Sequence, residues 1–164
     1  MTTIVWDGLH LVGDVKRSRE HNLCVSVQKV FKVEKPNLSL IANSHIITEF
    51  VDSHILFGSA GHSAGCVAFA EVISGRQANS ISDKALFSFS AIIVTDKGRI
   101  FEIEDSLLAV EITKGNAFLT KFAIGSGAAY AMAAMECGKN GKEAIEIASK
   151  FDSHTSKESF MVSF

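Results

Sequence analysis

Short runs of β-branched and aromatic residues in the first third of the chain predict β-strands. Thr2–Trp6 and Leu9–Val12 flank Asp7-Gly8, and an Asp-Gly pair between two such runs strongly indicates a β-hairpin. From Cys24 to Val33 the sequence CVSVQKVFKV alternates well enough to predict one further strand. Leu38–Phe57 mixes β-branched, aromatic and polar residues, and we expect two short strands there.

Helical spacing replaces this alternation in three later segments. Apolar residues follow a helical period from Ala64 to Gly75, after the glycines of GSAG. The alanine-rich stretch AAYAMAAMECG predicts a helix that packs closely against a neighbour, and KEAIEIASKF predicts another. Residues 77–84 are largely polar, and we expect a loop or a second helical piece there.

The remaining apolar runs predict a second hairpin and two more strands. Leu86–Val94 and Arg99–Glu104 flank TDKG, Phe122–Gly125 is a short apolar strand, and ESFMVSF is the last strand. The order is therefore strands, a helix, strands, two helices and a strand. This order favours the α+β class, with helices covering both faces of antiparallel sheet, over an alternating parallel sheet.

Length and composition are those of a folded protein of ordinary size. The 164 residues are enough for one domain, which we expect to span residues 1–164, and the 47% apolar and 21% charged residues argue against disorder. The net charge of −2 offers no general attraction for nucleic acid or an anionic membrane. No apolar run reaches the roughly 18 residues that a spanning helix needs. We therefore expect neither nucleic acid nor membrane as a partner.

The cysteines and histidines show no metal-ligand pattern. Cys24, Cys66 and Cys137 form an odd count, and the six histidines are scattered, with His154 interpreted as a surface residue. Nothing at the N-terminus resembles a secretory signal. We expect reduced thiols in a cytoplasmic protein, with no metal and no cofactor.

The N-terminus carries the first candidate chemistry. The chain is β-prone from Thr2 onward, whereas most domains leave their first residues loose. A threonine hydroxyl is a weak nucleophile that needs an adjacent base, and the α-amine of an N-terminal threonine can be that base once Met1 is removed. Such an amine titrates at about 7.7–8.0, so a sizeable fraction is neutral at working pH. The alternative is that Thr2 is an ordinary strand residue.

An aspartate and a lysine could complete such a site. Asp14 follows the second strand of the hairpin, which pairs with the strand of Thr2. Lys29 lies among the apolar residues of its predicted strand, where a lysine usually faces solvent. A buried Lys29 would instead need a carboxylate partner, for which Asp14 is the obvious candidate. A cation beside the Thr2 amine would also lower the pKa of that amine.

Two glycine turns and a late Asp-x-x-Thr pattern add further candidates. GSAG ends at Gly61 before a predicted helix and could offer a backbone N–H to a developing oxyanion. GSG at 125–127 places Ser126 within reach of a terminal amine. An ordinary turn also explains either glycine pattern, and a hydrogen-bonding device at a helix end also explains Asp152 with Thr155. Neither glycine pattern is a dinucleotide or phosphate-binding fingerprint.

Together these segments resemble the proteasome-type N-terminal nucleophile hydrolases, specifically the small bacterial HslV-like and phage-encoded proteasome-β-like proteins. The resemblance is carried by TTIVWDG, LVGD, QKVFKV, FGSAG, AIGSGAAYAMAAMECG and KEAIEIASKFDSHT. It implies a four-layer αββα sandwich. It also implies a role for each candidate: Thr2 as the nucleophile, Asp14 and Lys29 as the acid–lysine pair, Gly61 as the oxyanion-hole glycine, Ser126 as the serine near the terminal amine, and Asp152 with Thr155 as the late Asp-x-x-Ser/Thr pair.

The resemblance further implies a threonine-type peptidase that cleaves unfolded proteins inside a ring-shaped assembly after Met1 is removed. Its partners would be copies of itself in a ring, sometimes stacked, an AAA+ ATPase unfoldase and a polypeptide substrate. The long stretch Val33–Phe57 and the SKES after Thr155 depart from the family pattern. They motivate an alternative, a catalytically inert ring or decoy protein that binds a host protease or ATPase. A small-molecule amidase is a third hypothesis, since a fold alone does not determine function.

Overall fold

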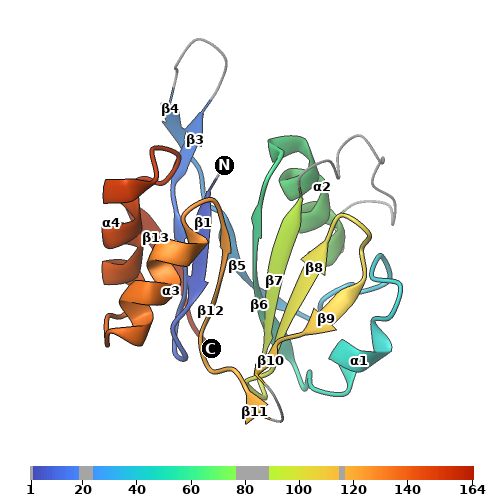
Figure 1. Ribbon diagram of the computed structural model, residues 1–164. Coiled ribbons are helices and arrows are strands. Elements are labelled where there is room, and N and C mark those ends of the chain that lie inside the picture. The colour runs from blue at the N-terminus through green and yellow to red at the C-terminus, as the bar shows by residue number, and fades with distance from the viewer. Residues whose placement is uncertain (1, 19–23, 77–88, 115–116) are drawn as a thin grey trace.

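Two antiparallel β-sheets form the centre of the structure, and helices lie on their outer sides (Figure 1). This computed structural model describes residues 2–18, 24–76, 89–114 and 117–164. One sheet has four strands, in the order β12 (Phe122–Gly125), β1 (Thr3–Trp6), β2 (Leu11–Asp14) and β13 (Ser159–Val162). The other has five, in the order β5 (Val30–Glu34), β6 (His54–Ala60), β7 (Ser90–Thr95), β8 (Ile100–Glu104) and β9 (Ala109–Glu111).

Four helices and two short strand pairs complete the described part of the chain. The helices are α1 (His45–Thr48), α2 (Ser63–Ile73), α3 (Ala128–Glu136) and α4 (Gly141–Phe151). The short pairs are β3 (Lys16–Ser18) with β4 (Cys24–Ser26), and β10 (Thr113–Lys114) with β11 (Ala117–Phe118). None of these helices is long and apolar enough to cross a membrane. The α+β class expected from the order of elements is therefore confirmed.

Three hydrophobic cores hold the layers of sheets and helices together. Val5 and Val12 pack with the small residues of α3 and α4 on one face of the four-stranded sheet, and Ile4 packs with residues of both sheets on its other face. The third core lies between the five-stranded sheet and helices α1 and α2, where Phe57 and Phe69 are fully buried. β1 is buried at every position because a helix layer covers one of its faces and the second sheet covers the other.

The strand register brings distant residues to the N-terminal end of β1. The predicted first hairpin forms, with Ile4 opposite Gly13 in β2. On its other side β1 pairs with β12, where Thr3 lies opposite Gly125. Because both pairings are antiparallel, the last residue of β2, Asp14, and the turn after β12 both arrive beside Thr2.

Helix α4 is held close to the hairpin at its N-terminus. Its first residue, Gly141, has no room for a side chain, because a Cβ there would lie 2.8 Å from Val12 Cγ2. The side chain of Asn140 accepts a bond from the N–H of Glu143, and the two residues form a capping box. The helix then runs to Asp152, which is its C-terminal cap. This placement determines where the residues that follow α4 lie.

Two predicted segments differ from the structure. Residues 38–57 do not form two short strands: they contain turns, helix α1 and the first part of β6. Their apolar residues, such as Ile41 and Ile47, are buried against the five-stranded sheet from a non-strand backbone. The predicted strand Cys24–Val33 is split into β4 and β5 by residues 27–29, which places Lys29 in the break. The predicted loop at 77–84 and residues 86–88 lie outside the described residues.

Candidate active site

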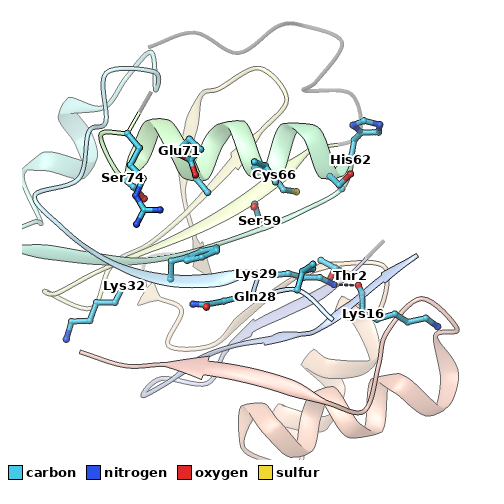
Figure 2. Close-up of a pocket in the computed structure, with 17 residues that line it drawn as sticks. Thr2, Lys16, Gln28, Lys29, Lys32, Ser59, His62, Cys66, Glu71 and Ser74 are labelled. Atoms are coloured by element: carbon cyan, nitrogen blue, oxygen red, sulfur yellow. Dashed lines mark hydrogen bonds between the residues drawn. The ribbon is translucent and has the colours of Figure 1, made fainter. Parts of the chain in front are cut away.

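Thr2, Asp14 and Lys29 form one buried cluster at the end of β1. The Thr2 hydroxyl donates a hydrogen bond to Asp14 Oδ1 and accepts one from Lys29 Nζ. Lys29 Nζ also lies 3.0 Å from Asp14 Oδ1. Figure 2 shows Thr2 and Lys29 pointing toward each other at one end of a pocket. The backbone break between β4 and β5 allows Lys29 to turn toward Thr2 instead of following the strand alternation.

Asp14 is fully buried, and its two carboxylate oxygens are both saturated with donors. Oδ1 accepts the N–H of Thr3 at 2.9 Å in addition to Thr2 and Lys29. Oδ2 accepts the N–H of Lys16 at 3.0 Å and the N–H of Ser156 at 3.1 Å. A buried carboxylate is tolerated only with such compensation. Ser156 therefore links the turn after α4 to the base of the cluster.

Lys29 is a buried cation with every ammonium donor used. Its side chain is 11% exposed, and Nζ donates to Thr2, to Asp14 and to the carbonyl oxygen of Lys16. Burial lowers the pKa of Lys29 below its ordinary value, and the attraction of Asp14 offsets only part of that effect. The solvent-facing interpretation of this lysine is therefore wrong, and its carboxylate partner is the one the sequence indicated.

A second polar network lies on the other side of Thr2. Asp152 Oδ2 accepts hydrogen bonds of 2.6 Å from Ser126 Oγ and from Thr155 Oγ1. Burial alone would raise the pKa of Asp152, but these two bonds and the N–H of His154 lower it below its usual range. The Ser126 N–H donates to the carbonyl oxygen of Thr2 at 3.0 Å. Ser126, Asp152 and Thr155 therefore lie together on this side of Thr2, and the structure brings together the three residues that were singled out from the sequence.

Gly61 lies where two cavities meet Thr2. Thr2 and Gly61 both line a pocket of about 500 Å³ and a second cavity of about 330 Å³. Gly61 has a φ of +119°, a backbone conformation that favours glycine. Cys66 and Glu71 of α2 and the C-cap residue Ser74 line one side of the larger pocket, and Gln28 and Lys29 line the other (Figure 2). Ser126 lines the smaller cavity.

The larger pocket has both apolar and charged walls, and Lys32 and Arg76 line it as well as Lys29. Its walls include Val27, Phe31, Val67 and Ala70. Cys66 also lines it. Burial raises the pKa of the Cys66 thiol, and a hydrogen bond with Ser59 reverses only part of that shift. The thiol is therefore protonated at neutral pH.

Several residues at the site were not singled out from the sequence. Thr3 is fully buried, with its hydroxyl 2.6 Å from that of Thr155, and Lys16 Nζ donates to the Ser153 carbonyl at 2.5 Å. Only closeness in the sequence to Thr2 and Asp14 could have suggested Thr3 and Lys16, because Thr155 and Ser153 lie 152 and 137 residues away from them. Cys66 and Cys137 are free thiols, and His154 is exposed, in line with the predictions for these residues. In the part of the chain that the structure describes, no group of His, Cys, Asp and Glu side chains could hold a metal ion.

Solved structures share this arrangement of elements across the whole chain. Eukaryotic HslV from Trypanosoma brucei is 16% identical, with 98% of this chain and 97% of that one covered and a TM-score of 0.60. Anbu from Hyphomicrobium sp. strain MC1 is 12% identical, with 100% and 82% covered and a TM-score of 0.68. The chain has the HslV and Anbu fold. Anbu from Pseudomonas aeruginosa, solved as a helical assembly, is 8% identical, with 100% and 81% covered and a TM-score of 0.64.

Two comparisons at the level of sequence found no match. No protein-family model matches the chain, and no curated sequence matches it. At 8–16% identity these structural neighbours establish the fold alone. The function must therefore be argued from the side chains of the site.

Proposed function

We propose that this protein is a threonine-type peptidase that becomes active when the peptide bond between Met1 and Thr2 is cleaved. The observation that carries the proposal is the position of the Thr2 hydroxyl between Lys29 Nζ and Asp14 Oδ1 at the edge of a pocket. A nucleophile, a cation of lowered pKa and a buried carboxylate at one cavity are the parts that acyl transfer requires.

In the proposed reaction Thr2 Oγ attacks the carbonyl carbon of a substrate peptide bond. The α-amine of Thr2 accepts the hydroxyl proton, directly or through a water molecule. Lys29 opposes a positive charge on that amine and so lowers its pKa, while Asp14 holds Lys29 in place. The proton passes to the leaving amine, and a water molecule then hydrolyses the acyl-enzyme ester, which restores the free Thr2 hydroxyl.

The remaining candidates surround this reaction centre. We assign the backbone N–H of Gly61 to the oxyanion, since Gly61 borders both cavities next to Thr2. Ser126, Asp152 and Thr155 orient the amine. The larger pocket, where Val27, Phe31 and Val67 offer apolar surface, takes a side chain of an extended polypeptide substrate.

The chain as a whole fits a chambered protease of the αββα type. The order of its cores, helix on sheet, sheet on sheet and sheet on helix, supports the four-layer sandwich. We propose that copies of the chain form a ring in the cytoplasm, that rings stack, and that an AAA+ ATPase delivers unfolded substrates. The helical assembly of P. aeruginosa Anbu supports self-association for a protein of this fold.

The deciding experiment measures peptide hydrolysis by protein whose first residue is shown by intact mass to be Thr2. Thr2→Ala should abolish hydrolysis of unfolded protein and peptide reporters, and Thr2→Ser should retain part of it. An epoxyketone that reacts with both the hydroxyl and the amine should add its mass to the wild-type protein and not to Thr2→Ala. Unchanged turnover in Thr2→Ala would refute the proposal.

The second candidate is a catalytically inert ring or decoy that binds a host protease or ATPase. The stretch Val33–Phe57 and the SKES after Thr155, which depart from the family pattern, motivate it. If Met1 is retained, the nitrogen of Thr2 is an amide and cannot accept a proton. Purified protein that retains Met1 and resists the epoxyketone would support this candidate. A monomer in light scattering would argue against a chambered assembly and for a small-molecule amidase.

A further inference from the structure

A buried row of hydroxyl groups connects the second residue of the TT pair to Asp152. The N–H of Gly127 donates to Thr3 Oγ1 at 3.0 Å, and Thr3 Oγ1 lies 2.6 Å from Thr155 Oγ1. Thr155 Oγ1 lies 2.6 Å from Asp152 Oδ2. All three side chains are at least nine-tenths buried, with exposures of 0% for Thr3, 4% for Thr155 and 9% for Asp152.

Counting protons fixes the direction of every bond in this row. An ionised carboxylate only accepts, so the single hydroxyl proton of Thr155 is donated to Asp152. The proton between the two threonines must therefore come from Thr3. The hydroxyl oxygen of Thr3 in turn accepts a hydrogen bond from the N–H of Gly127. The row is thus a one-way chain from Gly127 through Thr3 and Thr155 to the carboxylate, and bonds aligned in this way strengthen one another.

The row occupies the space that a side chain at residue 127 would need. A Cβ on Gly127 would collide with Thr3 Oγ1 and lie 2.8 Å from Thr155 Oγ1. Gly127 has a φ of −92°, so a glycine is needed here for space and not for conformation. The glycine after Ser126 is therefore explained by the two hydroxyls that occupy the place of its side chain.

The same proton count determines what Ser126 can offer to Thr2. The Ser126 hydroxyl proton is donated to Asp152 Oδ2. Ser126 lines the smaller cavity together with Thr2, and its hydroxyl oxygen has only lone pairs left to offer. A hydroxyl restricted in this way can accept a hydrogen bond from an amine at Thr2 but cannot donate one to it.

We propose that Thr3 is a positioning residue for the Thr2 amine, acting through Thr155, Asp152 and Ser126. The inference rests on the proposed function and adds to it a residue outside both cavities. Thr3 keeps Thr155 turned toward Asp152, Asp152 keeps Ser126 turned as an acceptor, and Ser126 keeps the lone pair of the amine directed at the Thr2 hydroxyl. Thr3 itself touches no reacting atom.

The test compares Thr3→Val with Thr3→Ser in protein that begins at Thr2. Thr3→Val keeps the shape and removes the hydroxyl, so kcat should fall roughly tenfold, the loss expected for one net hydrogen bond. KM should stay within twofold, because Thr3 lines neither cavity. Thr3→Ser should restore kcat to within about threefold of the wild-type value.

Thr95→Val is the matched control. Thr95 is equally buried, its hydroxyl accepts one hydrogen bond, from the N–H of Arg99 at 3.1 Å, and it lies in the other sheet. A loss of stability without a loss of kcat is expected for this control. Thr155→Val, which interrupts the same row one hydroxyl later, covers the case in which Thr3→Val does not fold. The two substitutions combined should lower kcat no further than either alone.

A readout without catalysis separates this inference from the proposed function. The ¹³C chemical shift of the Asp152 carboxyl, followed with pH, should give a higher pKa in Thr3→Val and an unchanged one in Thr3→Ser. His154 and the ammonium of Lys16, which bonds to Ser153 O, are present in all variants. An inactive wild type would refute only the peptidase, whereas an unchanged Asp152 pKa and kcat in Thr3→Val would overturn the role of Thr3.

Discussion

Replacement of Asp14 by asparagine should be among the most damaging single substitutions in this protein. Asn is nearly the same size, but one of its two terminal groups donates. In one orientation its NH₂ faces the N–H groups of Lys16 and Ser156, and in the other it faces Thr3 N and Lys29 Nζ. Either orientation sets donors against donors in a fully buried place.

The cost can be worked from these contacts. Removing one partner of a buried ion pair leaves the other uncompensated, which costs about 3–5 kcal/mol. For a chain of this length such a loss lowers the melting temperature by roughly 6–20 °C. Urea unfolding at pH 7 measures the loss, provided that the m value is unchanged between wild type and Asp14→Asn.

A second substitution tests the assigned cause. The main part of this loss is assigned to the buried ammonium of Lys29, which has no carboxylate partner in Asp14→Asn. If that is correct, Asp14→Asn combined with Lys29→Met should be about 1–3 kcal/mol more stable than Asp14→Asn alone. A double variant no more stable than the single one, or a single loss below about 1 kcal/mol, would refute the reasoning.

The defect of Asp14→Asn should also shrink as the pH rises. Asp14 raises the pKa of Lys29, so its removal lowers that pKa further below the ordinary lysine value. Between the lowered folded pKa and the unfolded pKa, the unfolded chain binds more protons, and stability therefore rises with pH. The difference from wild type should be smaller at pH 9 than at pH 7, and a difference that widens would contradict the burial of an ammonium.

Three further predictions concern the surroundings of the site and the fold. Gly127→Ala should cost about 1–3 kcal/mol in urea unfolding, because its Cβ would displace the hydroxyls of Thr3 and Thr155. Asn140→Ala should cost about 1 kcal/mol, because it removes the side-chain cap of α4, and a loss near zero would show that the cap is not needed. Burial would raise the pKa of Asp96, but three backbone N–H groups lower it to about 2. Its stabilising effect is therefore complete above about pH 4 and lost as the pH falls toward 2. Asp96→Asn should flatten the decline of stability over that range.

Local patterns predicted the elements whose partners are close in the sequence. The Asp-Gly turn and its flanking apolar runs predicted the first hairpin, and helical spacing predicted α2, α3 and α4 within a few residues of their bounds. The segment Leu38–Phe57 was predicted wrongly, because its mixed composition does not say which surface buries its apolar residues. In the structure the five-stranded sheet does so, and it needs turns and a short helix from this segment.

The candidate site, like the fold, could be predicted from the sequence only in part. The amino-acid types at Thr2, Asp14 and Lys29 were enough to suggest a nucleophile with an acid–lysine pair. Their meeting depends on pairings between β1, β2 and β12 and on the break before β5, which no alternation of apolar residues encodes.

The sequence by itself determined the chemical groups available, the turns and the helices, since these depend on residues only a few positions apart. The tertiary structure alone decided which of those groups form hydrogen bonds with one another. Thr3 obtained its place from Gly127 and Thr155, 124 and 152 positions away, because burial without water forces each polar atom to find a partner wherever the fold brings one.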